Sequence, residues 1–166
     1  MSHLLVDQLH FTRSEWLRAI DGLSDEDARR RLIPMNCISW MVGHLAWQEN
    51  RYWLRFAQEK NIAPHLDEIV GYGRPASTPP LKEMLEAWSA VTAESNLYLD
   101  TLSSDDLRTY YQYKGRKVSE SAGTLLQRVI YHYWFHTGEV LAIRQMMGHP
   151  NLPEFVGSFS DSAHYR

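Results

Sequence analysis

The chain has 166 residues, a formal net charge of −3 and a high aromatic content that includes six Trp and nine Tyr. This length suits a single domain with a sizeable core, and we expect residues 1–166 to form one domain. The mild charge and the lack of a dense basic run argue against nucleic acid as a partner, because non-specific binding needs a Lys/Arg face that neutralises phosphates.

Cysteine content and hydropathy point to a compartment. The single cysteine, Cys37, cannot form an intrachain disulfide, which is typical of a reducing compartment. The first residues lack the basic and apolar regions of a signal peptide. No apolar run approaches the roughly 18 residues that can span a bilayer. We therefore expect a soluble, cytoplasmic protein with no membrane partner.

Helical periodicity dominates the first part of the chain. Residues 4–23 carry a broken apolar stripe at helical spacing. Ser24 then resembles an N-cap followed by an acidic first turn, which predicts a short helix over 24–31. Ser39 is the expected N-cap of a second long helix over residues 40–60.

A long interruption follows, and residues 61–80 contain four prolines and two glycines. This composition makes a helix improbable and predicts a loop. A loop of this length is usually functional or crosses between elements that do not form a hairpin. It is long enough to let the second and third long helices run parallel.

The second half of the chain repeats the helical pattern. Periodicity resumes over residues 81–102, and Ser103 reads as the cap of another short turn. A polar connection is expected over 110–121 and a fourth long helix over 122–147, with a loop-like tail over 149–166. Four long helices around one core predict an all-α four-helix bundle with a long crossover between the second and third helices.

Three histidines in the two most aromatic helices stand out as possible metal ligands. His132 and His136 lie four residues apart and therefore share one helix face, along an otherwise apolar stripe. His44 could supply a third ligand from a facing helix. Three protein ligands with an open position are typical of a catalytic metal site. Spacing alone does not decide between this site and buried histidines that are merely hydrogen-bonded in the core.

Other candidates lie near these histidines. Glu139 could be a fourth ligand, a general base or an acceptor that holds an imidazole, although a solvated glutamate at a helix edge is slightly favoured. Gln48 could bind substrate or be a polar residue at a helix boundary. Trp47 is expected to line a pocket if His44 faces inward, and His65 is the loop histidine of interest. Cys37 is expected to be a small buried residue rather than a nucleophile.

Two segments carry a family resemblance. TLLQRVIYHYWFHTGEVLAIRQMMG and SWMVGHLAWQENRYW resemble the fourth-helix and second-helix signatures of the DinB-like (DinB/YfiT) superfamily. The resemblance extends over nearly the whole chain. It implies a four-helix bundle of up-down-down-up topology that is often dimeric. It also implies a divalent metal held by three residues, which match His44, His132 and His136.

The resemblance further implies a chemistry. Characterised relatives include thiol-dependent S-transferases and a mycothiol-dependent maleylpyruvate isomerase, in which the metal is thought to activate a low-molecular-weight thiol. Relatives often carry Arg-Gly-Gln after the last histidine, whereas this chain has Thr137, Gly138 and Glu139. The arginine of those relatives therefore has no counterpart at this position, and the added carboxylate draws attention to Glu139.

Three functional hypotheses remain open from the sequence. The first is a cytoplasmic metal-dependent enzyme of the S-transferase or hydrolase type, with Zn²⁺ first and Ni²⁺, Fe²⁺ or Mn²⁺ as alternatives, possible use of a low-molecular-weight thiol, and a small-molecule substrate. The second is a metal-binding stress-response or interaction module without turnover. The third is a plain helical bundle. We expect a homodimer, formed through Trp-rich helix faces.

Overall fold

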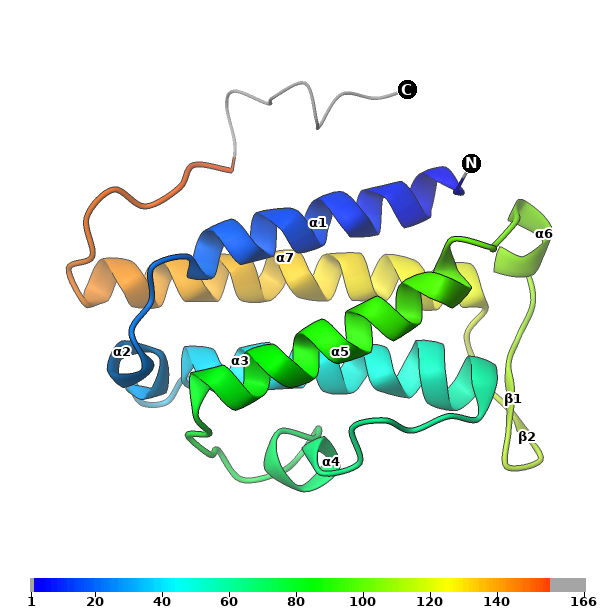
Figure 1. Ribbon diagram of the computed structural model, residues 1–166, viewed down its shortest axis with the longest axis horizontal. Coiled ribbons are helices and arrows are strands. Elements are labelled where there is room, and N and C mark those ends of the chain that lie inside the picture. The colour runs from blue at the N-terminus through cyan, green and yellow to red at the C-terminus, as the bar shows by residue number, and fades with distance from the viewer. Residues whose placement is uncertain (1, 156–166) are drawn as a thin grey trace.

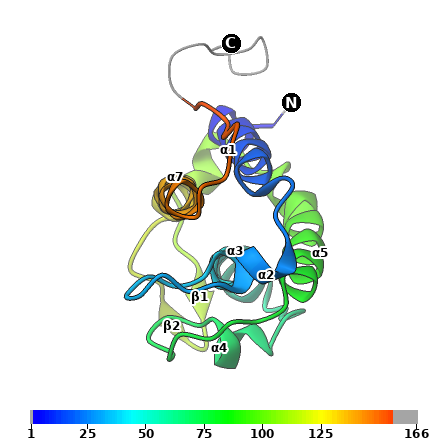
Figure 2. The same cartoon turned by 90° about the vertical axis from the view of Figure 1, so that its left-hand side faces the viewer.

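The computed structural model describes residues 2–155 of the chain. Helices make up most of it, which confirms the prediction of an all-α chain, and four of them are long: α1 (Leu4–Ile20), α3 (Ile38–Glu49), α5 (Leu81–Leu99) and α7 (Ala122–Met146). In Figure 1, α1 and α7 run from right to left, whereas α3 and α5 run from left to right. α1 packs mainly on α7 and α3 mainly on α5, so two helix pairs face each other (Figure 2).

Short elements connect the long helices. Helix α2 (Asp25–Arg29) follows α1, α4 (Leu66–Ile69) lies in the long crossover, and α6 (Ser104–Leu107) follows α5. The Ser24 and Ser103 side chains accept bonds from backbone N–H groups at the starts of α2 and α6, as the sequence predicts. No helix in residues 2–155 is long and apolar enough to cross a membrane.

The second long helix differs from its prediction at both ends. It begins at Ile38 after Cys37, and Ser39 lies buried inside its first turn, so the assignment of Ser39 as N-cap is wrong. After Glu49 the helix widens into a π-helix, η1 (Asn50–Phe56). The Asn50 side chain there donates to Asn61 Oδ1 and accepts from the backbone of Ile62, which fixes the start of the crossover.

A small hairpin replaces the irregular connection expected after α6. Strands β1 (Gln112–Tyr113) and β2 (Arg116–Lys117) pair antiparallel around Lys114 and Gly115. Both turn residues have positive φ, 51° and 73°, as a type I′ turn requires. Lysine is a poor residue for the left-handed region, where Asn, Asp or Gly are favoured.

A buried polar network joins all four long helices. Arg13 of α1 donates from Nε to Glu49 Oε1 of α3 at 2.9 Å, and a second bond joins its Nη2 to Oε2. Tyr133 of α7 donates to the same Oε1 at 2.6 Å. From α5, Trp88 donates to the Tyr133 hydroxyl and Asn96 accepts from Arg13. The pairing of these side chains fixes how the two helix pairs meet.

Candidate metal centre

His44 of α3 and His132 and His136 of α7 come together between the two helix pairs. One nitrogen atom from each ring lies within 4.8 Å of the others. The His132 and His136 ring centres are 4.5 Å apart, and the His44 ring meets both edge-on at 5.1 and 5.8 Å. The structure therefore brings together the three residues that the sequence singles out, and a single ion could bind all of them.

His44 is held in place by two indole rings and a loop carbonyl. Its imidazole stacks between Trp40 and Trp47, with ring centres 4.4 and 5.2 Å away. Its Nδ1 donates to the Val70 carbonyl at 2.7 Å, so the end of α4 fixes the ring orientation. Burial lowers the pKa of His44 to about 4, because the charged ring would lose its hydration.

His132 is oriented from the facing helix. Its Nδ1 donates to the side-chain oxygen of Gln48 at 2.8 Å, one turn beyond His44. Burial, together with the nearby His136 and His44 rings, lowers the pKa of His132 to about 3. Gln48 therefore contacts a histidine, rather than serving only as a boundary residue.

His136 is held from its own helix. Its Nδ1 donates to Glu139 Oε2 at 2.6 Å, across one helical turn. Its Nε2 is buried and has no hydrogen-bond partner in residues 2–155. A buried polar atom without a partner costs roughly 1–3 kcal/mol, so an ion that accepted its lone pair would relieve that cost.

These bonds define the tautomers of all three rings. Each Nδ1 faces an oxygen acceptor and therefore carries the proton, which leaves each Nε2 with a free lone pair. Neutral imidazoles whose other nitrogen donates to a carboxylate, amide or carbonyl oxygen are the usual form of histidine metal ligands. The donor set therefore fits a divalent ion of the Zn²⁺ type.

The cluster opens to the surface through a cleft of about 750 Å³. His44 and His132 lie in its wall, while His136 is not among its lining residues. Trp47 lines this cleft, as expected for an inward-facing His44. Tyr131 and Phe135, both largely exposed, lie on the α7 side of the cleft. A small molecule in the cleft would therefore meet two of the three histidines.

The structure also shows where the remaining candidate residues lie. Cys37 is buried with its Sγ near Ser39 and the Ser77 carbonyl, away from the histidines. His65 is exposed in the crossover, next to α4. Glu139 is half-buried against His136, which supports the acceptor interpretation over that of a freely solvated glutamate.

Sequence reasoning missed three contributors to the site. The Val70 carbonyl could not be identified, because any residue type can offer a backbone oxygen. Arg51 and Tyr52 line the cleft from η1, and they lie two turns beyond His44 on the same side of the helix. The four-residue spacing of His44, Gln48 and Tyr52 was the available signal for this shared face.

Comparison with known proteins adds a family and a fold. A sequence model of the DinB superfamily matches residues 8–140. The crystal structure of a conserved protein from Enterococcus faecalis superposes with a TM-score of 0.64 at 15% identity, covering 89% of this chain and 99% of that one. At that identity the likeness concerns the fold alone. No curated protein matches this chain.

Proposed function

Since this chain belongs to the DinB superfamily, as the resemblance of its second and fourth helices predicts, we propose that it is a divalent-metal-dependent enzyme. We assign the ion to His44, His132 and His136, with Zn²⁺ as the first choice and Ni²⁺, Fe²⁺ or Mn²⁺ as alternatives. The observation that carries the proposal is the buried Nε2 of His136, which has no hydrogen-bond partner among residues 2–155 and lies beside the imidazoles of His44 and His132.

The proposed reaction is of the S-transferase or hydrolase type, with a small-molecule substrate. An ion in this site would supply Lewis-acid chemistry, lowering the pKa of a water molecule or a low-molecular-weight thiol at its open position. The chain's own contribution is to orient the metal-binding histidines and to line the cleft in which the substrate would bind. Trp40 and Trp47 stack on the two faces of His44, Gln48 fixes His132, and the cleft gives a substrate access to both of these histidines.

Metal analysis of protein purified without a His-tag tests the assignment. We expect about one divalent ion per chain in the wild type and loss of that ion in His132→Ala and His136→Ala. His65→Ala removes an exposed histidine outside the cluster and should retain the ion. A wild type that takes up no divalent ion, or variants that all retain it, would contradict the metal site.

Two alternative roles of Glu139 can be distinguished by experiment. If it only holds His136, Glu139→Leu should weaken metal binding about 10- to 100-fold, while Glu139→Gln keeps an acceptor oxygen and loses less. Activity would then follow metal occupancy. If Glu139 is a general base, Glu139→Gln loses activity even when fully loaded with metal, and its pH–rate profile changes. Glu83→Gln, at an exposed position on α5, is the matched control.

The alternative is a metal-binding stress-response or interaction module without turnover. Assays that combine several small thiols with a panel of electrophiles and esters distinguish the two. Turnover that disappears in His132→Ala supports the enzyme. A fully loaded protein that turns over none of these substrates supports the module instead.

We also infer the finer points of architecture that the family suggests. The directions of the long helices in Figure 1 support a four-helix bundle of up-down-down-up topology, formed as a single domain. A cytoplasmic homodimer remains a prediction. Sedimentation of the purified protein measures its mass in solution and tests the dimer directly.

A further inference from the structure

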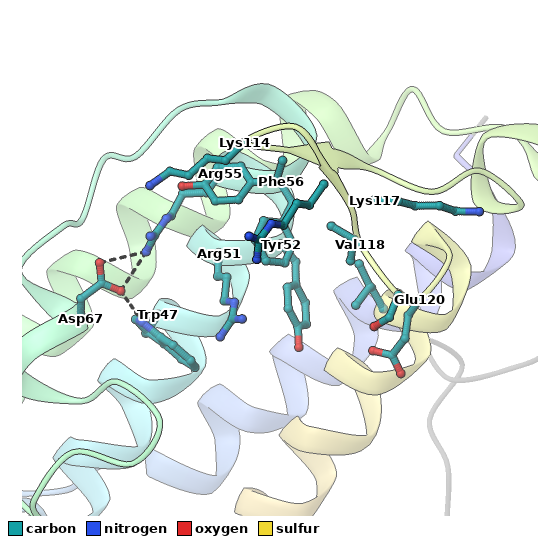
Figure 3. A pocket seen from close by; sticks show the side chains of 14 residues that line it. Trp47, Arg51, Tyr52, Arg55, Phe56, Asp67, Lys114, Lys117, Val118 and Glu120 are labelled. Atoms are coloured by element: carbon teal, nitrogen blue, oxygen red, sulfur yellow. Dashed lines mark hydrogen bonds and ion pairs between the residues drawn. The ribbon is translucent and has the colours of Figure 1, made fainter.

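A second cavity, of about 710 Å³, adjoins the histidine cleft. The two cavities share Trp47, Arg51 and Tyr52 in their walls. In Figure 3, Arg51 and Tyr52 lie between Trp47 and Asp67 on one side and Val118 and Glu120 on the other. A molecule bound at the histidines could therefore extend into this second cavity.

The walls of this cavity are strongly cationic in a chain whose net charge is −3. Arginine and lysine side chains line it from η1 and from the hairpin: Arg51, Arg55, Lys114, Arg116 and Lys117. Only two carboxylates, Asp67 and Glu120, line it with them. Because like charges repel, such a concentration favours a negatively charged occupant.

Both carboxylates are already bound to other groups. Asp67 accepts from Arg55 at 2.8 and 2.9 Å and from the Trp47 indole at 2.7 Å. Glu120 accepts from Arg128, which lines the neighbouring cleft. Within residues 2–155, the other four cations of the cavity form no ion pair with a carboxylate. The Lys117 ammonium lies 3.8 Å from the Tyr110 ring centre, and in Figure 3 it points away from Arg51. The charges of Arg51, Lys114 and Arg116 therefore remain available for a ligand.

Arg51 is the best placed of these cations. Its guanidinium lies over the rings of Trp47 and Phe56, 5.4 and 5.3 Å from their centres, and it is half-buried. Aromatic faces orient a guanidinium while leaving its N–H donors free. A planar fork of this kind suits a carboxylate or a phosphate.

The local backbone on both sides departs from the usual preferences. Arg51 and Arg55 lie on the π-helix η1, a form of helix that is frequent at functional sites. Lys114 occupies a left-handed turn position that favours Asn or Asp. These departures meet at one cavity, since β1 contacts η1. A role in ligand binding would explain why lysine is present at this turn.

We propose that this cavity binds the dianionic part of a small molecule, a dicarboxylate or a phosphate monoester, whose other end reaches the histidine cluster. Arg51 donates to the anion, and Lys114 at the hairpin turn neutralises part of its charge. Only the position of the far end depends on the proposed metal-dependent activity. The anion site itself does not require the metal.

Titration calorimetry at low salt tests the site with succinate and inorganic phosphate as probes, and with acetate and succinamide as comparisons. We expect at least one dianion to bind, with acetate and succinamide bound at least tenfold more weakly. Binding should weaken as salt is added, because screening reduces charge attraction. Binding by succinate alone would indicate a dicarboxylate ligand, and binding by phosphate alone a phosphate ester.

Variants locate the binding. Arg51→Gln should weaken the dianion at least tenfold, and Lys114→Asn should weaken it severalfold while suiting the turn. Arg30→Gln removes the same charge from the exposed end of α2, at the opposite end of the molecule in Figure 1, and should change nothing. The circular dichroism spectra and melting temperatures of all variants serve as folding checks.

Three outcomes would overturn the proposal, and the third concerns His132→Ala. One is an absence of binding by both dianions to the well-folded wild type. Another is equal weakening by Arg30→Gln and Arg51→Gln, which would indicate general charge attraction. His132→Ala separates this site from the metal site, because it should retain dianion binding even if no metal is ever found. Loss of dianion binding in His132→Ala alone would instead place the anion on the metal and contradict the cavity site.

Discussion

At the residue scale, the three histidines share one arrangement. In each ring, an oxygen acceptor fixes the proton on Nδ1, and the acceptors come from three different sources: the Val70 carbonyl, Gln48 and Glu139. The rings are therefore oriented before any ligand arrives. Such preorganisation reduces the cost of binding, because few side chains need to be ordered at that moment.

Because His44 and His132 are buried and resist protonation, we expect the metal-free protein to lose stability in acid. The pKa values of His44 and His132 are lowered to about 4 and about 3, whereas unfolded histidine has a pKa of about 6.5. Between pH 6.5 and 4 the unfolded chain therefore binds more protons than the folded one, and stability falls as pH falls. We expect His44 alone to contribute a loss of about 2 kcal/mol between pH 7 and pH 5.

Urea unfolding of chelator-treated protein at several pH values measures this loss. The His132→Gln variant lacks one of the two groups and should show a shallower dependence on pH. An equally steep dependence in the variant would mean that His132 does not carry the effect.

At the element scale, α3 approaches α5 closely at Gly43, next to His44. A Cβ atom there would lie 2.3 Å from Met84 Sδ and 3.2 Å from Val70 Cγ1. Gly138, on the exposed face of α7, has no neighbouring atoms within 4 Å of the same position. The two glycines therefore offer a matched pair, in which one position is crowded and the other is open.

We predict opposite effects for alanine at these positions. Gly43→Ala should destabilise the protein by about 1–3 kcal/mol, because Met84 and Val70 must move. Movement of Val70 also displaces the carbonyl that holds His44, so metal affinity should fall as well. Gly138→Ala should stabilise the helix by about 0.5–1 kcal/mol. Thermal unfolding measures the changes in stability, and metal titration measures the change in affinity. If Gly43→Ala left stability unchanged, Met84 and Val70 would not be tightly packed against this position.

The elements also show what the sequence could and could not predict. The long helices could be predicted from the helical periodicity of the sequence. The same periodicity places His132 and His136 on one helix face. The π-helix η1 was missed because seven residues are too few to distinguish its period from that of an α-helix. Two-residue strands leave no alternation to detect, so the hairpin was missed, although Lys114-Gly115 was an available turn signal.

The candidate metal centre could also be predicted in part. His44 could be proposed as a ligand from its helix, but whether it faces the other histidines depends on how α3 packs against α7. The partners of the imidazoles require distances that only the fold supplies. The short basic run over residues 114–117 supplies three of the five cations of the cavity and is visible in the sequence. That this run meets Arg51 and Arg55 of η1, far away in the chain, depends on the fold.

At the scale of the whole molecule, the Arg13–Glu49 pair stands out as a buried ion pair that touches every long helix through its partners. Both side chains are almost fully buried, at 5% and 0% exposure. Removing one charge leaves the other buried without a partner, which typically costs about 3–5 kcal/mol. Replacing both with apolar residues of similar size is often far less costly.

A double-mutant cycle tests this pair. We expect Arg13→Met and Glu49→Leu to lower the free energy of unfolding by about 3–5 kcal/mol each, and the double variant to lose less than either single variant. Asp105→Asn breaks an exposed ion pair on α6 and should change stability by less than about 0.5 kcal/mol. Single losses below 1 kcal/mol would show that the pair is not a structural requirement.

The position of the histidines between the two helix pairs has a consequence for the life of the protein in a cell. His44 belongs to the α3–α5 pair, and His132 and His136 belong to the α1–α7 pair. A ligand that binds all three therefore ties the pairs together and stabilises only the folded chain. Chains without the ion would unfold more often and would be degraded faster by proteases. The abundance of the protein would then follow the supply of the ion in its surroundings.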